Sequence, residues 1–433
     1  MGACLKSAVI QGDKALAPQT LRLGSAVAVG LLLLACGGSS GTGSGQNHAP
    51  FTVGYLLPLT GVFAANGANE RNGWNLAASE MGSTFNGHQI STTFADTQAD
   101  PQLALNASRN FVASQNVDLL EGPLNAAEVN AVTNYVAPLG EPTDDLTFCS
   151  TLQLTDYQKY KNAISSGWSC DQPSLMLGQY AYNTLHLKHM TVVAFDYAFG
   201  WLSAGAFIST FEKAGGTIDK TIFFPSTTVD FSPYVSEIPS GTQGVYVVAG
   251  GAPAVRFTQT FSSFGLKSKI PLLGINVLTD YSVLPQEAPA NVLGVYTASN
   301  YCDGISTAAN KRFTAGYMAK YGTYPGYYSE AGYVKYEIAA AVLNKLGSTS
   351  PSDHKAVAAL LRSVKVTAPR GPVSLSRVTY SPVQNVYVCK VESVDGTLRN
   401  VPVQTYPSVQ PWGPLSQSQW TSLFEHDSAA RPQ

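Results

Sequence analysis

From residue 51 onward, strand patterns and helix patterns alternate along the chain. The segment 51–59 is a mostly apolar run typical of a buried strand, and 69–81 then has apolar residues at helical spacing. After the strand pattern at 88–96, Asp100 followed by Pro101 predicts the start of a helix. Such alternating units indicate parallel sheets covered by helices. The alternation continues through 117–136, 189–216, 217–225, 244–251, 271–276 and 292–299.

The length of the chain and its number of strands favour two α/β lobes. A chain of 433 residues exceeds the size at which a single hydrophobic core stops growing. About nine strands are also too many for one compact sheet of this type. The proline-rich and serine-rich end at 408–433 is expected to be poorly ordered. Between these regions we expect helices at 306–322, 329–347 and 352–364, and a hairpin through 368–376 and 385–393.

Charge and motifs argue against several classes of function. The net charge is −2, and the chain has no basic run that would follow a nucleic-acid backbone or an anionic membrane surface. His186 and His189 have a spacing that can hold a metal, but no third ligand is near in sequence, so we expect no metal and no cofactor. The adjacent Asp144 and Asp145 would face opposite sides of a strand. Because nucleophile-elbow and zinc-protease motifs are also missing from the sequence, we do not expect an enzyme.

An export signal precedes the first strand. Basic residues stand before an apolar run at 23–35, which is short for a membrane span but suits a signal peptide. The stretch that ends at Cys36 resembles a bacterial lipobox, in which the cysteine receives the lipid. The resemblance implies a signal peptide at 1–35, lipidation of Cys36 and a flexible tether at 36–50. The alternative is an ordinary secretory signal with an incidental cysteine.

Four further cysteines remain in the exported chain. An even number in an oxidising compartment favours disulfides. The preferred pairing is Cys149–Cys170, which closes a local excursion, with Cys302–Cys389 as the second bridge. Since four cysteines allow three connectivities, the other two pairings stay open.

Seven stretches of the mature chain match one known family in order, at 54–80, 96–112, 121–128, 195–216, 229–238, 313–325 and 369–376. One contains an Asp-x-x-x-Asp-Pro entry to a helix. Together they resemble the type I periplasmic solute-binding proteins of the branched-chain amino-acid (Leu/Ile/Val-binding) class, which serve ABC importers. The resemblance implies an α/β fold of two doubly wound, Rossmann-like lobes joined by a three-strand hinge. The implied boundaries are 51–150 with 302–362 for lobe 1, and 151–301 with 363–407 for lobe 2.

The resemblance also implies where the ligand lies, in loops beyond the carboxyl ends of the strands, where helix N-termini offer free N–H groups. In the family a hydroxyl residue usually stands at each end of the triplet that is Asn125 to Ala127 here, and this chain has neither. No acidic residue stands at Gly251 or Ala252, where some amino-acid binders hold the ligand's ammonium group, which leaves Asp303 as a candidate amine contact. The implied ligand-binding residues are Tyr55, Leu57, Thr60, Phe63, Asn125, Ala126, Ala127, Tyr197, Phe199, Gly251, Ala252, Asn276, Tyr301, Asp303 and Tyr328.

These features predict a lipid-anchored solute-binding protein of an ABC importer, exported to the periplasmic or extracellular face of a bacterial membrane. It is expected to capture a small amino-acid-like solute, or an aromatic or aliphatic carboxylate, by lobe closure. The expected partners are the solute, the permease subunits and, through the lipid anchor alone, the membrane; nucleic acid is not expected, and the protein is expected to be a monomer. A ligand-sensing receptor of the same fold is the first alternative, and a hydrolase on this scaffold is the second.

Overall fold

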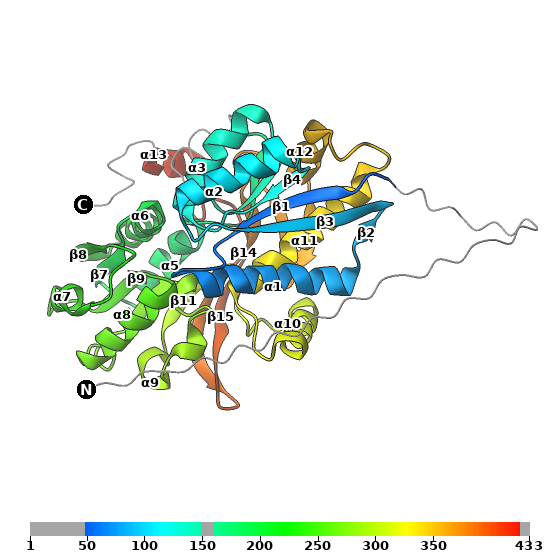
Figure 1. Ribbon diagram of the computed structural model, residues 1–433. Coiled ribbons are helices and arrows are strands. Elements are labelled where there is room, and N and C mark those ends of the chain that lie inside the picture. The colour runs from blue at the N-terminus through cyan, green and yellow to red at the C-terminus, as the bar shows by residue number, and fades with distance from the viewer. Residues whose placement is uncertain (1–47, 149–159, 425–433) are drawn as a thin grey trace, which may run out of the picture. The chain divides into compact units, whose positions relative to one another are not determined.

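Two sheets organise the described part of the chain, which comprises residues 48–148 and 160–424 of a computed structural model. The first sheet has six strands in the order β2-β3-β1-β4-β5-β6. Neighbouring strands run parallel except β2, which pairs antiparallel with β3 (Figure 1). The strands are β1 (Phe51–Leu57), β2 (Thr84–Phe85), β3 (His88–Asp96), β4 (Leu119–Glu121), β5 (Thr143–Phe148) and β6 (Ala163–Ser169).

Helices cover both faces of the first sheet because alternate residues of its strands are apolar on opposite sides. Along β1, Tyr55 packs with Trp74 of α1 at 5.2 Å between ring centroids, whereas the adjacent Leu56 belongs to a separate cluster with Phe111. The predicted cap is confirmed at α2, where the Asp100 side chain accepts from the N–H groups of residues 102 and 103. The helices are α1 (Ala64–Met81), α2 (Pro101–Arg109), α3 (Ala126–Val136), α10 (Ala308–Tyr321), α11 (Tyr327–Leu346) and α12 (His354–Arg362).

The helices α1 and α11 approach each other closely through two glycines. A Cβ atom on Gly73 would lie 1.8 Å from the Ser329 carbonyl oxygen, and one on Gly332 would lie 2.0 Å from the Glu70 carbonyl oxygen. Neither position accepts a larger residue without separating the helices. This contact joins a helix from the start of the chain to one from its last third.

The second sheet has nine strands. Eight follow the order β12-β13-β14-β11-β10-β9-β7-β8, and β15 pairs antiparallel with β14. The strands are β7 (His189–Phe195), β8 (Thr217–Phe224), β9 (Gly244–Val248), β10 (Leu272–Ile275), β11 (Tyr296–Ser299), β12 (Lys365–Ala368), β13 (Gly371–Leu375), β14 (Pro382–Val394) and β15 (Thr397–Val409). The associated helices are α5 (Gln172–Asn183), α6 (Ala198–Lys213), α7 (Ser232–Ser236), α8 (Gly251–Ser263), α9 (Pro289–Val292) and α13 (Gln417–Phe424).

We call the six-stranded sheet with its helices the first lobe and the nine-stranded sheet with its helices the second lobe. Within the described residues, the chain passes between the sheets three times: after β6, after β11 and after α12. This arrangement agrees with the predicted fold class of two α/β lobes.

Two of the predicted boundaries are corrected by the structure. The segment Ala163–Ser169 forms β6 of the first sheet, so the first lobe extends beyond residue 150. Because three of the seven residues of β6 are serines, its sequence does not have the apolar pattern expected of a fully buried strand. The predicted poorly ordered tail is wrong for residues 408–424, because Trp420 of α13 is fully buried and its indole N–H donates to the Asp171 carboxylate. Burial of a large aromatic ring and a satisfied indole N–H hold this helix in place.

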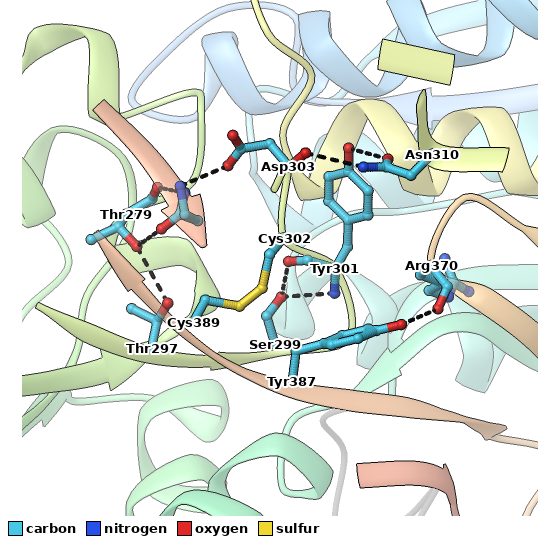
Figure 2. Close-up of a disulfide and its surroundings, with 11 residues drawn as sticks. Thr279, Thr297, Ser299, Tyr301, Cys302, Asp303, Asn310, Arg370, Tyr387 and Cys389 are labelled. Atoms are coloured by element: carbon cyan, nitrogen blue, oxygen red, sulfur yellow. Dashed lines mark hydrogen bonds between the residues drawn. A yellow bond between two sulfur atoms is a disulfide. The ribbon is translucent and has the colours of Figure 1, made fainter. Parts of the chain in front are cut away.

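Cysteine pairing is resolved for one bridge (Figure 2). Cys302 and Cys389 form a disulfide with a Cα–Cα distance of 6.5 Å, as the sequence analysis preferred. Cys149 lies outside the described residues, and its pairing with Cys170 stays a prediction. The segments with the predicted signal peptide and Cys36 also lie outside the described residues. Among the residues that are described, no helix is long and apolar enough to cross a membrane, and no cluster of three potential metal ligands occurs.

Candidate ligand-binding site

A cavity of about 430 Å³, including space open to solvent, is lined by residues from both lobes. Six of the lining side chains are aromatic, and none is charged. The first lobe contributes Phe63, Leu124, Asn125, Ala126, Trp168 and Tyr328, and the second contributes Phe195, Tyr197, Phe199, Gly250 and Val277.

Four of the six aromatic side chains pack against one another and form a continuous wall. Phe199 is central: its ring centroid lies 5.8 Å from that of Trp168, 6.3 Å from that of Phe195 and 6.1 Å from that of Tyr197. These separations are typical of tilted and edge-to-face aromatic pairs. Because Trp168 belongs to the first lobe and Phe199 to the second, the wall continues across the two lobes. The cavity therefore presents flat apolar surface to a ligand.

Three helices of eleven residues or more begin at this cavity. The helix α3 starts after Asn125, α6 starts after Tyr197, and α8 starts after Gly250, and each of these three residues lines the cavity. The first backbone N–H groups of a helix have no acceptor within the helix, and they carry partial positive charge. The capping residues of α6 and α8 make no side-chain hydrogen bond to them. The cavity is thus suited to an anionic group.

The start of α3 leaves one donor free. The Asn125 side chain accepts from the Ala127 N–H at 2.8 Å, and Glu128 accepts from the Asn125 N–H at 3.1 Å. This capping box therefore occupies the Asn125 carboxamide oxygen. In the described part of the structure, the backbone N–H of Ala126 has no acceptor. Since Ala126 lines the cavity, its N–H is a candidate donor to a ligand carboxylate.

The lobes approach each other beside the cavity at Gly251. This residue has a φ of +61°, and a Cβ atom there would lie 3.1 Å from the Val62 carbonyl oxygen and 3.3 Å from the Phe63 ring. Glycine meets the need for a left-handed backbone and for space at once. A larger residue would press on Phe63, which lines the cavity.

One buried carboxyl group lies behind the cavity wall. Glu128 is completely buried, and burial raises its pKa from 4.5 to about 7, although hydrogen bonds from the Thr97 side chain and the Asn125 N–H oppose the rise. The pKa of Tyr197 is also raised, first by burial of its ring and then by the charge of Glu128. The ionisation of Glu128 therefore changes the electrostatic potential at Tyr197, which lines the cavity.

The structure brings six of the predicted binding residues to this cavity: Phe63, Asn125, Ala126, Tyr197, Phe199 and Tyr328. It does not bring there Leu57, nor Ala127, Gly251 and Ala252, which follow lining residues within two positions in sequence. Tyr55 instead donates to Glu70 at 2.7 Å inside the first lobe. Thr60 donates to Asp96 at 2.6 Å on the exposed first loop. These two side chains are held by partners on their own lobe.

The remaining three predicted residues lie in a separate polar cluster around the disulfide, and Figure 2 shows two of them, Tyr301 and Asp303. Asp303 pairs with the Arg399 guanidinium and also accepts from the Asn400 N–H at 3.0 Å, so its expected role as an amine contact in the cavity is corrected. Tyr301 donates to Asn310 at 2.9 Å. Asn276 lines the same cluster, whereas the next residue, Val277, reaches the cavity.

Five lining residues were missed by the sequence analysis: Leu124, Trp168, Phe195, Gly250 and Val277. Leu124, Gly250 and Val277 each stand next to a predicted residue, so the predicted loops reach the cavity, but the lining residue is one position away from the predicted one. Trp168 had no signal, because β6 was not recognised as a strand.

The chain belongs to the family of periplasmic binding proteins, whose model matches residues 50–397. Its two-sheet α/β fold is that of type I periplasmic binding proteins, as the sequence resemblance implied. Members of this class are solute-binding proteins that work with ABC transporters, and this chain is one of them.

Curated and solved relatives agree with this assignment. The Leu/Ile/Val-binding protein homolog 6 of Brucella melitensis is 27% identical over 360 residues, which cover 82% of this chain and 91% of that protein. A solute-binding protein of an ABC transporter from Rhodopseudomonas palustris BisB5, in complex with 3,4-dihydroxybenzoic acid, is 26% identical with a TM-score of 0.79 and covers 84% of this chain and 98% of its own. Another from R. palustris, in complex with benzoate, is 25% identical with a TM-score of 0.75 and covers 82% of this chain and 96% of its own.

Proposed function

We propose that this protein captures a small aromatic monocarboxylate and delivers it to an ABC permease. The observation that supports this most is the meeting of an uncharged, aromatic cavity with three helix N-termini. The N-termini favour the carboxylate, and the rings favour an apolar body. The two R. palustris proteins in complex with benzoate and 3,4-dihydroxybenzoic acid point to the same ligand class.

An amino acid fits the cavity less well. Its ammonium group would lose its hydration on entry and would need an acceptor of opposite charge. None of the residues that line the cavity carries a carboxylate, and Asp303 is paired with Arg399 elsewhere. We therefore expect benzoate to bind more tightly than leucine, in spite of the similarity to a Leu/Ile/Val-binding protein homolog.

Binding proceeds by closure of the lobes over the ligand. The carboxylate takes the Ala126 N–H and the first N–H groups of α6 and α8, which belong to different lobes. The ring packs against the wall that Trp168 of the first lobe and Phe199 of the second form together. Since each end of the ligand then touches both lobes, the ligand stabilises the closed arrangement over an open one. The permease then receives the ligand from the closed form.

The protein is further proposed to work as a monomer anchored through a lipid on Cys36, on the outer side of a bacterial membrane. The apolar run before Cys36 and the small residue at position 35 support this anchor. Mass spectrometry of the exported protein tests it by the mass of its first peptide. The Cys36→Ser variant is expected to leave the membrane fraction, and retention there would contradict the anchor.

Isothermal titration calorimetry of the purified protein with benzoate, 4-hydroxybenzoate and leucine tests the proposed identity of the ligand. The key variant is Ala126→Pro, since proline suits the first position of a helix but lacks the N–H group. It is expected to weaken benzoate binding about tenfold or more, the effect of losing a hydrogen bond to a charged group. Ala308→Pro, at the first position of α10, is the matched control. Tighter binding of leucine than of benzoate would overturn the proposal.

A further inference from the structure

A short turn of the second lobe reaches across to two helices of the first. The Asp280 carboxylate accepts through Oδ1 from the Ser282 N–H at 2.9 Å and through Oδ2 from the Tyr327 N–H, the first residue of α11. The Ser282 hydroxyl accepts from the Asn66 carboxamide of α1 at 3.3 Å. Asp280, Ser282, Asn66 and Tyr327 are all buried. We call these four residues the inter-lobe clasp.

The clasp supplies a hydrogen-bond acceptor to the first N–H group of α11. This helix of twenty residues begins after Gly326, which has no side chain to cap the first N–H groups. Asp280 supplies the missing acceptor from the other lobe, and its negative charge lies at the positive end of the helix. The Tyr327 N–H therefore has this acceptor only when the second lobe is in place.

The backbone at Gly326 is shaped for this contact. A Cβ atom on Gly326 would lie 2.3 Å from Asp280 Oδ2 and 2.8 Å from its Cγ. Any other residue would displace the carboxylate from the Tyr327 N–H. The φ of Gly326 is −105°, so the position does not require glycine for its backbone angle. Space for Asp280 is the reason that the structure shows for a glycine at this position.

The clasp is joined directly to the ligand cavity. Tyr328 lines the cavity and follows Tyr327, whose N–H the clasp holds. The Tyr327 ring also lies 5.6 Å from that of Trp168 and 5.1 Å from that of Tyr328, both in the cavity wall. On the opposite lobe, Val277 lines the cavity three residues before Asp280. One hydrogen bond thus joins the two lobes within a few residues of the wall on each side.

We propose that Asp280 is a positioning residue that couples lobe closure to the shape of the ligand cavity. When the lobes close, its carboxylate caps α11, and this sets Tyr327 and Tyr328 against the ligand. When they open, α11 loses its cap, so the clasp biases the protein toward the closed arrangement. The affinity part of this inference rests on the proposed function, whereas the conformational part does not.

The Asp280→Asn variant tests the clasp with little change of shape. Asparagine has a single carboxamide oxygen, so it accepts one of the two N–H groups that Asp280 accepts now. Gly326→Ala tests the same contact from the first lobe. The matched controls are Asp100→Asn, which caps α2 within one lobe, and Gly241→Ala, where an added Cβ meets nothing within 4 Å.

The first measurement is small-angle X-ray scattering of the four ligand-free variants and the unchanged protein. Asp280→Asn and Gly326→Ala are expected to increase the radius of gyration, and the controls are not. A structural role confined to one lobe would lower the melting temperature without this increase. Only variants that fold are compared, and equal radii in the folded clasp variants, the controls and the unchanged protein would overturn the inference.

The second measurement is titration with benzoate. Both clasp variants are expected to bind benzoate about tenfold more weakly, as befits the loss of a charge-assisted hydrogen bond in the closed form. Unchanged affinity together with an unchanged radius of gyration contradicts the clasp. If the unchanged protein does not bind benzoate, 4-hydroxybenzoate or leucine, the proposed function fails, and scattering alone decides the inference.

Discussion

Cys302 and Cys389 form a disulfide that fastens the chain where it leaves the second sheet for the first (Figure 2). Cys302 lies between β11 and α10, and Cys389 lies on β14 opposite Thr297 of β11. Next to it, Asp303 pairs with Arg399 of the neighbouring β15. The second of the three crossings is thus held by a covalent bond and an ion pair to the β14–β15 hairpin.

The disulfide is expected to stabilise the fold rather than to form the cavity. The two cysteines are 87 residues apart, so their bond constrains a long loop of the unfolded chain. The Cys302→Ser/Cys389→Ser variant is expected to lose about 2–4 kcal/mol of unfolding free energy in urea. Benzoate affinity is expected to stay within about twofold, because neither cysteine lines the cavity. A variant as stable as the unchanged protein would contradict this role.

The fluorescence of Trp168 is expected to report ligand binding in the cavity. Its ring lines the cavity, whereas Trp201 donates to Asp196 at 2.9 Å on an exposed part of α6. Benzoate in the cavity changes the surroundings of the Trp168 ring, so we expect its addition to change the intrinsic emission. The change is expected to vanish in Trp168→Phe and to persist in Trp201→Phe. If Trp201→Phe abolished it instead, the ligand would bind elsewhere.

The raised pKa of Glu128 leads to a prediction of how the free energy of unfolding depends on pH. Its pKa in the folded protein is about 7, raised from 4.5 mainly by burial. A carboxyl group with a raised pKa contributes stability that is complete below its ordinary pKa and is lost as the pH rises through the folded value. Urea unfolding is therefore expected to show a falling free energy between about pH 5 and about pH 8. Glu128→Gln, which still accepts from Asn125, is expected to make this fall less steep.

The same residue predicts how ligand affinity depends on pH. Ionised Glu128 adds negative charge behind the cavity, so benzoate is expected to bind more weakly above about pH 7. Glu128→Gln is expected to remove this loss of affinity. Glu337→Gln is the matched control, because Glu337 has a pKa of about 8 and lies away from the cavity. A loss of affinity that is equal in both variants would exclude Glu128 as its cause.

Much of the fold was accessible from the sequence because its signals are local. The cap at Asp100 and the apolar run of β1 follow from residues that are adjacent in the chain. By contrast, β6 contains Ser165, Ser166 and Ser169, all of them buried. Ser165 donates to the Trp168 carbonyl at 3.1 Å, and the Ser166 N–H donates to Asp144 at 2.8 Å. The first of these partners belongs to the same strand and the second to the neighbouring β5, and alternation alone reveals neither.

The sequence indicated which loops lie at the candidate site, but not which of their residues line the cavity. Parallel strands present their carboxyl ends at one edge, and the loops predicted around residues 125, 197 and 251 do reach the cavity. Which side chain faces the cavity depends on the turn that follows each strand. Val277 therefore reaches it, whereas the neighbouring Asn276 lies in the polar cluster. Asp303 was misjudged because Arg399, its partner, lies almost a hundred residues further along the chain.

Lys335 holds together a buried group of charges in the first lobe. It is fully buried and donates to Glu121 at 2.7 Å, and its ammonium lies 3.8 Å from Asp144. Burial alone would lower the pKa of Lys335, but Asp144, Glu121 and Glu70 raise it above its usual value. Burial raises the pKa of Glu70 to about 7 and that of Glu121 above its usual range, with Lys335 opposing both shifts. One cation thus compensates several carboxyl groups.

The Lys335→Met variant is expected to lose about 3–5 kcal/mol of unfolding free energy near neutral pH, because it leaves buried carboxylates without a cation. Without Lys335, these carboxyl groups bind protons more tightly in the folded than in the unfolded chain, so their contribution to stability is lost as the pH rises. The deficit, measured by urea unfolding, is therefore expected to be smaller at about pH 5 than at about pH 8. Lys311→Met, at an exposed position of α10, is the control and is expected to stay within about 0.5 kcal/mol of the unchanged protein. A deficit that is independent of pH would mean that lost packing around the Lys335 side chain, and not the uncompensated charge, destabilises the variant.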